Sequence, residues 1–346
     1  MEIPTHLDDL TASWLSAALR VPVRACSLLD AHAGTTGRAL IELDYAEVST
    51  LPSRLFVKLP PTDEMQRAFV ASSGMGLREV RFYQQLSDEV PLRVPRCYFA
   101  AAHDSGDAYI MLLENLTDNG CTFNNISHFY SLEYVRKVLA AFARLHAAYW
   151  ESPRFSADLD WLQPPLQHDI ALPLIESALE QYAGQMPPVF AQMGELYLRN
   201  TDAIHALWAQ GPQTLIHGDV HDANFFMDDA QVGFLDWALV ARGPAMRDVG
   251  YFLASALQQG DLRGLRALVE YYRRELASQG VMPPQYDVFW SQLQWHAAYV
   301  WVGATVTLAM GDAWLPLNYS LGSLEKLHAA MVHLDSVAAI SNAIGR

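Results

Sequence analysis

Apolar residues along the chain follow two different periods, and the change between them falls near residue 113. Before it, short apolar runs between turn residues predict β-strands at 28–30, 39–45, 55–59 and 109–113. The same part has one clear helical pattern, at 77–86, where apolar residues recur every three or four positions. We therefore expect a small sheet with one helix in this part of the chain.

The second part of the chain has mostly helical periodicity. Helical patterns occupy 132–149, 174–182, 191–208, 248–257, 265–276, 286–308 and 323–344. Proline pairs between several of these patterns separate helices rather than domains. The predicted fold class is α+β, with a strand-rich lobe at 1–113, a hinge at 114–118 and a larger helical lobe at 119–346.

Composition indicates a globular protein and restricts its partners. The 346 residues are 51% hydrophobic and 18% charged, enough to bury a substantial core. A formal net charge of -15 argues against nucleic acid as a partner, because binding to phosphate backbones relies on Lys and Arg patches. The acidity would attract a cationic small molecule, although net acidity is also an ordinary feature of soluble proteins.

Cysteine use and the N-terminus predict a reduced, cytoplasmic location. Cys26, Cys97 and Cys121 are widely spaced, which argues against a disulfide framework or a zinc site. The first residues lack the positive region and apolar core of a secretory signal. The longest uncharged run, 297–310, is too short for a membrane span and predicts a core helix. No membrane partner is expected, and the oligomeric state stays undefined.

The sequence 217–224 reads His-Gly-Asp-Val-His-Asp-Ala-Asn and is followed by Leu-Asp-Trp at 235–237. Between them lie two short apolar runs joined by a polar turn at 228–230, which predict a β-hairpin. The first residue of one antiparallel strand faces the last residue of its partner. The hairpin therefore predicts that Asn224 and Asp236 lie side by side.

These residues suit phosphoryl transfer. Mg²⁺ prefers oxygen ligands, so Asn224 and Asp236 are the predicted metal ligands. Asp219 precedes the hairpin and is the predicted catalytic base, which orients an acceptor hydroxyl and takes its proton. Asp219 and Asn224 keep the interval of the protein-kinase pattern, His-x-Asp followed by four residues and Asn.

The segment 217–224 with 235–237 resembles the catalytic core of the aminoglycoside phosphotransferase and choline kinase-like superfamily. That core is His-Gly-Asp-x-His-x-x-Asn with a later Ile/Leu-Asp-Trp. Weaker similarity extends over about 23–256, and Leu-His-Ala-Ala-Tyr-Trp at 145–150 resembles the ecdysteroid kinase-like branch. The resemblance implies a two-lobed protein-kinase-like fold that uses ATP and Mg²⁺.

The resemblance also assigns roles in the first lobe. Lys58, in the apolar run at 55–59, is similar to the third-strand lysine that contacts the α and β phosphates. Glu79, near the start of the predicted helix, would pair with Lys58 and hold it toward the phosphates. In the hinge, backbone groups of Glu114 and Leu116 would bind the adenine.

A loop of small residues precedes Lys58 and contains Gly34, Thr35, Thr36 and Gly37. Its amides and hydroxyls could approach phosphate, and its position before Lys58 favours that role. It departs from the glycine pattern of protein kinases. The alternative is that this sequence merely connects two strands of a hairpin.

The residues after Asp236 point to a small-molecule alcohol as acceptor. The segment 242–247 leads almost at once to the next predicted helix, near Asp248, which leaves little room for a peptide platform. The resemblance makes Asp248 a brace for the catalytic loop, while the alternative is a plain carboxylate at a helix N-terminus. Aminoglycosides, choline-like amines and other alcohols are all acceptors in proteins with this core.

Other interpretations of the same residues stay open at this point. A catalytically silent nucleotide-binding module would keep the same motifs without transfer activity. A metallohydrolase would use His217, Asp219 and His221 as ligands, although such sites normally need further His and Asp clusters. His146 is more typical of a hydrogen-bonded core histidine than of a ligand contact. Trp295, Trp301 and Trp314 could form an aromatic wall for substrate, although core packing is the simpler interpretation.

Overall fold

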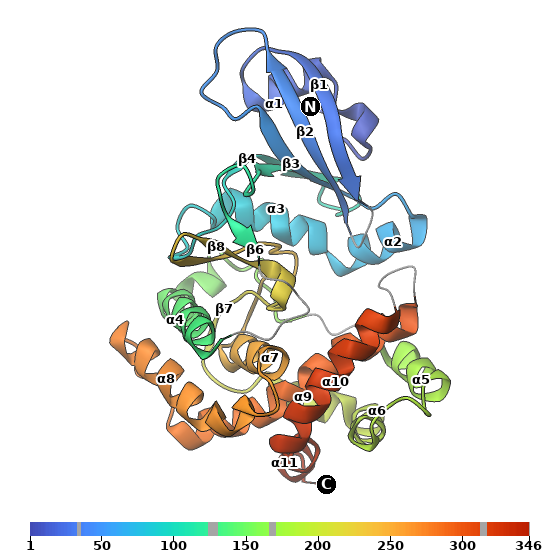
Figure 1. The fold of residues 1–346 in the computed structure, drawn as a ribbon, viewed down its shortest axis with the longest axis vertical. Helices are drawn as coiled ribbons and strands as arrows, with labels where there is room; N and C mark the ends of the chain where they lie inside the picture. The colour runs from blue at the N-terminus through green and yellow to red at the C-terminus, as the bar shows by residue number, and fades with distance from the viewer. Residues whose placement is uncertain (33–35, 124–130, 166–170, 312–316, 346) are drawn as a thin grey trace. The chain divides into compact units, whose positions relative to one another are not determined.

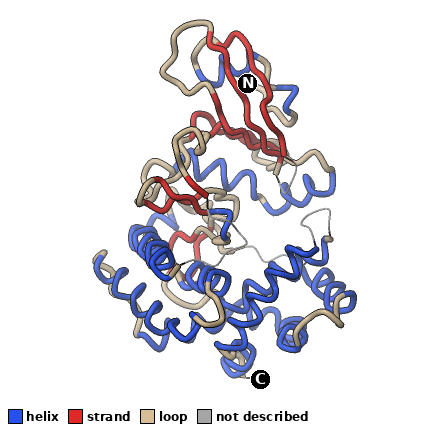
Figure 2. Tube along the Cα trace, in the orientation of Figure 1, coloured by secondary structure: helices blue, strands red, loops and turns tan. Residues whose placement is uncertain are grey.

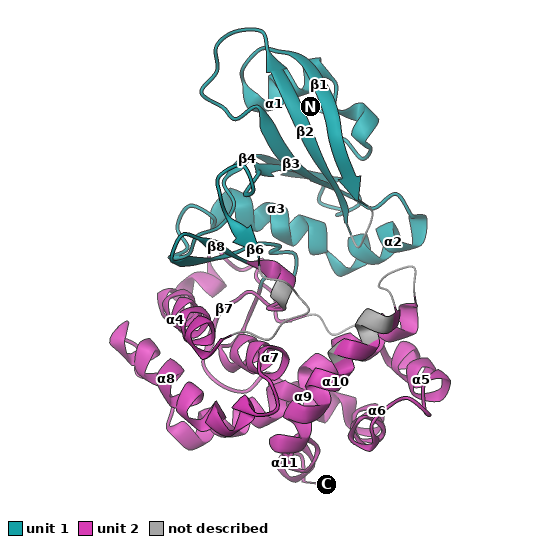
Figure 3. Ribbon diagram, viewed as in Figure 1, with its two compact units in different colours: residues 1–123, 226–240 teal, residues 124–225, 241–346 magenta. Residues whose placement is uncertain are grey.

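The computed structural model describes residues 1–32, 36–123, 131–165, 171–311 and 317–345. The chain forms two compact units, coloured separately in Figure 3. Unit 1 consists of 1–123 and 226–240, and unit 2 consists of 124–225 and 241–346. The segment 114–118 belongs to unit 1, and its role as a hinge stays a prediction.

Unit 1 contains an antiparallel sheet of five strands in the order β1-β2-β3-β5-β4. The strands are β1 Val23–His32, β2 Gly37–Tyr45, β3 Arg54–Leu59, β4 Cys97–Ala102 and β5 Tyr109–Glu114. Alternate residues of β2 are buried, as expected where one face of a sheet covers a core, and β3 buries Leu55 and all of 57–59. The four predicted strands are therefore present, and each is longer than its apolar run.

The helices of unit 1 correct the prediction of a single helix. They are α1 Ala12–Leu19, α2 Glu64–Ser73 and α3 Met75–Gln85, with a 3₁₀ turn η1 at Leu7–Asp9. The pattern at 77–86 is α3, whereas α2 buries only Val70 and Ser73 and so has little apolar signal. Asp63 caps the N-terminus of α2, and Gly74, with φ of +69°, ends α2 and begins α3.

The hairpin predicted after the motif at 217–224 is present. It consists of β8 Phe225–Asp228 and β9 Gln231–Phe234, and β6 Thr122–Phe123 adds a third strand beside β8. Gly233 passes directly under the ring of Phe226, where a Cβ atom would lie 2.2 Å from Cζ. The close packing of the two strands therefore requires glycine at this position.

Unit 2 is mainly helical, as Figure 2 shows. Its helices are α4 Leu132–Ala148, α5 Ala171–Gln181, α6 Pro188–Trp208, α7 Met246–Ala256, α8 Leu265–Ser278, α9 Tyr286–Met310, α10 Leu317–His333 and α11 Ser336–Ala343. Short 3₁₀ turns are η2 Pro153–Ser156, η3 Asp222–Asn224 and η4 Asp261–Gly264. A two-stranded antiparallel sheet pairs β7 Gln213–Ile216 with β10 Ala241–Pro244.

Helix α9 is the central element of unit 2 and contacts α5, α6, α7, α8, α10 and α11 (Figure 1). Apolar residues surround its axis, which explains the uncharged run at 297–310 and confirms it as a core helix. None of the helices in the described ranges is long and apolar enough to cross a membrane.

Two features of unit 2 differ from the predictions. The pattern at 323–344 is two helices, because the chain breaks at Asp335, whose backbone adopts a left-handed conformation with φ of +49°. The segment 241–244, expected only to lead into α7, forms strand β10. Neither feature has a strong local signal, because Asp335 is not glycine and β10 has only four residues.

Candidate active site

The loop 217–224 joins β7 to β8, and Asp248 holds its beginning. The Asp248 carboxylate is fully buried and accepts hydrogen bonds from the backbone N–H of His217 at 2.7 Å and of Gly218 at 2.9 Å. Gly218 has φ of +84°, a conformation that favours glycine. Asp248 therefore braces the loop 217–224 and is more than a carboxylate at a helix start.

His146 supports this brace from α4. Its Nε2 lies 3.4 Å from Oδ2 of Asp248, and its Nδ1 lies 2.7 Å from the hydroxyl of Tyr272. All three side chains are buried. His146 is thus a hydrogen-bonded core histidine, as predicted.

Both histidines of the motif stabilise the loop backbone. Nδ1 of His217 accepts the N–H of Asp219, and Nδ1 of His221 accepts the N–H of Ala223, each at 3.2 Å. A backbone N–H can only donate, so these nitrogens act as acceptors within the loop. Their use in the loop argues against the metallohydrolase interpretation.

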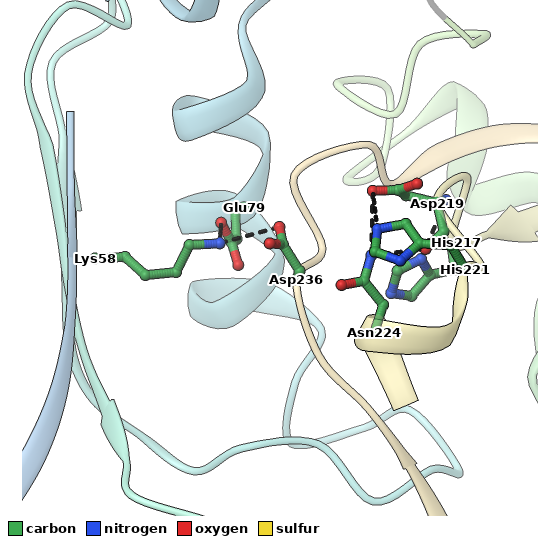
Figure 4. A network of polar contacts seen from close by, with 7 residues as sticks. All are labelled: Lys58, Glu79, His217, Asp219, His221, Asn224 and Asp236. Carbon is green, nitrogen blue, oxygen red and sulfur yellow. Dashed lines mark hydrogen bonds and ion pairs between the residues drawn. The ribbon is translucent and has the colours of Figure 1, made fainter. Parts of the chain in front are cut away.

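Asp219 is a partly exposed carboxylate with side-chain donors on both oxygens. The hydroxyl of Tyr251 donates to Oδ1 at 3.2 Å. Nδ2 of Asn224 donates to Oδ2 at 3.1 Å, as Figure 4 shows. Burial opposes ionisation of Asp219, but His221, His217 and the Tyr251 hydrogen bond outweigh it and lower the pKa to about 2. Asp219 is therefore ionised throughout the neutral range.

Tyr251 was not identified from the sequence. It lies three residues after Asp248 on α7, so both side chains lie on neighbouring positions of one helix face. This spacing from Asp248 is the signal in the sequence that could have identified Tyr251.

Asn224 has a fixed amide orientation. Its Nδ2 donates to the backbone carbonyl of Asp219 at 2.8 Å in addition to the carboxylate. The amide oxygen consequently points away from Asp219, as Figure 4 shows. This oxygen is the atom that a hard cation would use.

In unit 1, Lys58 lies between two carboxylates (Figure 4). Its Nζ is 2.6 Å from Oε2 of Glu79 and 3.0 Å from Oδ1 of Asp236. The three residues come from β3, from α3 and from the segment after β9. Lys58 and Glu79 are buried, whereas the Asp236 side chain is 28% exposed.

The electrostatics of this cluster are set by one cation and two anions. Burial opposes the charge of Lys58, but Asp236 and Glu79 outweigh it and raise the pKa of the ammonium. Burial, together with the charge of Asp236, raises the pKa of Glu79 to about 7 although Lys58 acts in the opposite direction. Lys58 is thus firmly protonated, while Glu79 titrates near neutrality.

Asp236 has a strained backbone and a rigid neighbour. Its φ of +62° lies in the left-handed region, which costs a non-glycine residue roughly 1–2 kcal/mol. The next residue, Trp237, stacks on Phe82 of α3 with ring centroids 3.9 Å apart. Such strain is typical of functional positions that the surrounding packing fixes.

The predicted phosphate loop is only partly described. Gly34 and Thr35 lie outside the described residues. Thr36 is buried, and Gly37 begins β2 with its Cα so close to Pro60 that a Cβ would lie 3.0 Å from the Pro60 carbonyl oxygen. A phosphate-binding role for these residues stays a prediction.

Glu114 and Leu116 have defined structural contacts. The Glu114 carboxylate accepts hydrogen bonds from Arg93, from the Arg96 N–H and from Asn119. The Glu114 N–H donates to the Arg96 carbonyl, and the Leu116 carbonyl accepts from the N–H groups of Asn119 and Cys121. An adenine bound here would have to use the Glu114 carbonyl and the Leu116 N–H, because the other two backbone groups are already hydrogen-bonded. This adenine-binding role stays a prediction.

The candidate residues thus form two groups. Asp219 and Asn224 contact each other in unit 2, and Lys58 contacts both Glu79 and Asp236 in unit 1. Because Asn224 and Asp236 belong to different units, their pairing around a metal ion stays a prediction.

The C-terminal tryptophans have packing roles where they are described. Trp301 is fully buried and packs against Tyr197, and the carbonyl of Trp295 accepts a hydrogen bond from Trp208. Trp314 lies outside the described residues. Core packing therefore accounts for Trp301 without a ligand.

Solved structures with a similar fold include phosphotransferases and kinases. A putative aminoglycoside phosphotransferase from Ralstonia eutropha is 15% identical, with a TM-score of 0.54 over 94% of this chain and 97% of its own. The GDP complex of aminoglycoside 2'-phosphotransferase-IIIa is 11% identical, with a TM-score of 0.54 over 93% and 98%. Choline kinase from Cryptosporidium parvum is 11% identical, with a TM-score of 0.53 over 94% of both chains.

These similarities confirm the predicted α+β kinase-like fold, with its antiparallel sheet followed by a helical part. No curated protein matches the sequence. Residues 45–289 match the phosphotransferase enzyme family, in a segment that contains Lys58, Glu79, Asp219, Asn224 and Asp236. The chain belongs to this family, APH, as the motif at 217–224 and its brace on Asp248 had indicated.

Proposed function

We propose that this protein is an ATP- and Mg²⁺-dependent phosphotransferase that moves the γ-phosphoryl group to a hydroxyl of a small molecule. The observation that carries the proposal is the setting of Asp219. An ionised, partly exposed carboxylate stands on a loop whose backbone is fixed by a buried second carboxylate, Asp248. Such a group orients a hydroxyl in line with a phosphoryl group.

In this reaction the acceptor oxygen forms a bond to the γ-phosphorus while the bond from that phosphorus to the bridging oxygen breaks. The nucleoside diphosphate leaves with that electron pair, and the acceptor proton passes to Asp219. A pKa of about 2 makes Asp219 a weak base, so its main contribution is to orient the acceptor. This agrees with a loose transition state, in which the proton is transferred late.

The cluster around Lys58 supports nucleotide binding. Above the pKa of Glu79, one ammonium between two carboxylates leaves a net negative charge, which a divalent cation would balance. The residues fit Mg²⁺, because Asp236 offers a partly exposed carboxylate and Asn224 an oriented amide oxygen, both of the type Mg²⁺ prefers. When bound, the ion would neutralise phosphate charge, and Lys58 would stabilise the phosphate oxygens.

Two observations support a small acceptor. Helix α7 begins at Met246, and the residues between Asp236 and α7 include β10, which is paired with β7. Little chain is therefore available there as a peptide platform. The similar structures named above include an aminoglycoside phosphotransferase and a choline kinase. The acceptors in their names, aminoglycosides and choline, are small alcohols.

A screen of ATP consumption over a diverse panel of small alcohols tests this function. We expect acceptor-dependent ADP release, and a decrease in kcat of about 10²–10⁴-fold in Asp219→Asn with nucleotide affinity retained. Asp229→Asn is the matched control, because it makes the same change at a carboxylate that lies exposed in the hairpin turn.

Full activity of Asp219→Asn would reject the role of Asp219. Calorimetry that detects ATP binding while no compound accepts phosphate would instead favour the silent nucleotide-binding module. Tightly held Zn²⁺ or Fe in the purified protein would favour the metallohydrolase.

A further inference from the structure

Arg247, the second residue of α7, is a buried cation without a carboxylate partner among the described residues. It exposes 6% of its surface, and its Nε is enclosed with no hydrogen-bond acceptor in the described part of the chain. Lys58 and Arg93, by contrast, each contact two carboxylates. The chain has 38 Asp and Glu against 23 Lys and Arg, so a shortage of acidic residues does not explain the difference.

The surroundings of Arg247 are aromatic. Its guanidinium lies over the ring of Tyr299, with Cζ 3.4 Å from the ring centroid. Tyr299 packs edge-to-face on Trp208, which stacks on Tyr197. The ring attracts the face of the guanidinium but accepts none of its in-plane N–H groups. A guanidinium stacked in this way presents a planar edge of donors, which matches a carboxylate.

The histidines near Arg247 add no positive charge to its surroundings. His296 on α9 is fully buried, and neither of its ring nitrogens has a hydrogen-bond partner among the described residues. Burial and then the charge of Arg247 lower the pKa of His296 well below its usual value, and the same two causes lower the pKa of His205. A single positive charge remains, which balances a monoanion better than a dianion.

Arg247 lies on α7 next to the residues that hold the loop of Asp219. It directly precedes Asp248, the brace of the loop, and lies four residues before Tyr251, whose hydroxyl contacts Asp219. Residues four apart on a helix share a face and are separated by about 6 Å along the axis. The first turns of α7 therefore carry both the contacts to Asp219 and the unpaired cation.

We propose that Arg247 binds a carboxylate of the acceptor, so that the substrates are hydroxy acids, including zwitterionic amino hydroxy acids. This inference rests on the proposed function, because it concerns the acceptor of the same phosphoryl transfer. Asp219 would orient the hydroxyl of the acceptor. Arg247 would bind the carboxylate of the acceptor and so favour those alcohols whose hydroxyl then lies at Asp219. Arg247 is thus a specificity residue that leaves the transfer step itself to others.

The test compares hydroxy acids with the primary amides made from them, alongside choline and an aminoglycoside, in the ATP-consumption assay. The amide keeps the size and the hydroxyl but loses the charge. We expect kcat/KM to be about 100-fold higher for the acid than for its amide, mainly through KM. Arg247→Met should remove this preference, and Arg247→Lys should retain part of it.

Arg199→Met is the matched control, since Arg199 is an exposed arginine of α6 paired with Glu195. It should leave the acid preference unchanged. Thermal unfolding without acceptor gives a second measurement that does not depend on activity. A buried charge without a partner destabilises the fold, so Arg247→Met should unfold at a higher temperature than the wild type. A purely structural arginine would give a lower unfolding temperature.

The outcomes separate the two proposals. Transfer to amides, choline or the aminoglycoside that equals or exceeds transfer to the acids would overturn the role of Arg247 and leave the proposed function intact. An unchanged acid preference in Arg247→Met, or a lower unfolding temperature of that variant, would also overturn it. Absence of acceptor-dependent ATP use with every compound would overturn the proposed function, and this inference with it.

Discussion

The carboxylate of Asp248 accepts a hydrogen bond of 2.7 Å from the backbone N–H of His217, across 31 residues of chain. The same carboxylate accepts the Gly218 N–H and is fully buried. The beginning of the loop 217–224 is therefore held by a side chain of α7 and does not depend on the loop's own sequence alone.

Replacing Asp248 with Asn tests this brace. One oxygen becomes an NH₂ group, which cannot accept, so a buried N–H of the loop loses its partner. We expect a loss of about 1–3 kcal/mol in the free energy of unfolding, measured in urea, and a marked decrease in kcat.

Asp287→Asn is the control for the alternative in which Asp248 is only a carboxylate at a helix N-terminus. Asp287 is an exposed carboxylate in the first turn of α9, so its loss should change stability by no more than about 1 kcal/mol. Equal effects of the two substitutions would mean that Asp248 acts only through the helix dipole.

Tyr251 is predicted to position Asp219. In Tyr251→Phe the hydrogen bond to Oδ1 is lost, and because that bond lowers the pKa of Asp219, the pKa should rise. From a value of about 2 it would still lie well below neutrality, so the rate lost at pH 7 reports orientation and not protonation. We expect kcat to decrease about tenfold, with the acid limb of the pH profile moved to higher pH.

Tyr271→Phe on α8 serves as its control, since the Tyr271 hydroxyl interacts with Glu275. A Tyr251→Phe enzyme with wild-type kcat and an unmoved acid limb would exclude the positioning role.

The candidate residues that the sequence identified are those for which the phosphotransferase motif fixes both residue type and spacing. Asp219, Asn224 and Asp236 stand at fixed intervals around a short hairpin, and Lys58 occupies an apolar strand, so local patterns were sufficient to propose them, while their roles stay predictions. The contact between Lys58 and Glu79 was inferred through the family resemblance and is present at 2.6 Å.

Other features depend on tertiary contacts that leave no local pattern. Helix α2 buries few residues, and β10 is a strand only because β7 pairs with it. In the sequence, Tyr251 and Arg247 have no feature that separates them from other residues of a helix. Their spacing from Asp248 can be read from the sequence, but their contacts with Asp219 and Tyr299 are known only from the structure.

A double-mutant cycle tests the cluster around Lys58. Lys58→Met leaves Glu79 buried without its cation, whereas Lys58→Met with Glu79→Gln removes both charges. Removing one member of a buried pair costs about 3–5 kcal/mol at most, less here because Glu79 can take up a proton. We expect the double variant to be more stable in urea than Lys58→Met alone, with nucleotide binding lost in both.

Additive effects in this cycle would show that the two side chains do not interact in solution. Lys58→Arg provides a further comparison, because it retains the charge but changes the geometry of the contact. It should retain more of the wild-type stability than Lys58→Met.

The raised pKa of Glu79 predicts an unusual pH dependence of stability. Unfolded Glu79 has an ordinary pKa of 4.5, whereas in the folded protein burial and then the charge of Asp236, opposed by Lys58, raise the pKa to about 7. Between these values the folded state binds a proton that the unfolded state has released. This contribution to stability is complete below pH 4.5 and is lost as the pH rises to 7.

Unfolding in urea of the wild type and Glu79→Gln at several pH values between about 4 and 8 measures this effect. The amide of the variant does not titrate, so the free energy of unfolding of the wild type should fall relative to the variant by up to about 3 kcal/mol across that window. Asp236→Asn removes the negative charge that raises the pKa of Glu79, and in that background the fall should be smaller and should end at a lower pH. The difference in the free energy of unfolding between wild type and Glu79→Gln could instead stay constant from pH 4.5 to 7. That result would mean that Glu79 is already ionised at low pH and is paired fully with Lys58, without competition from Asp236 for the same ammonium.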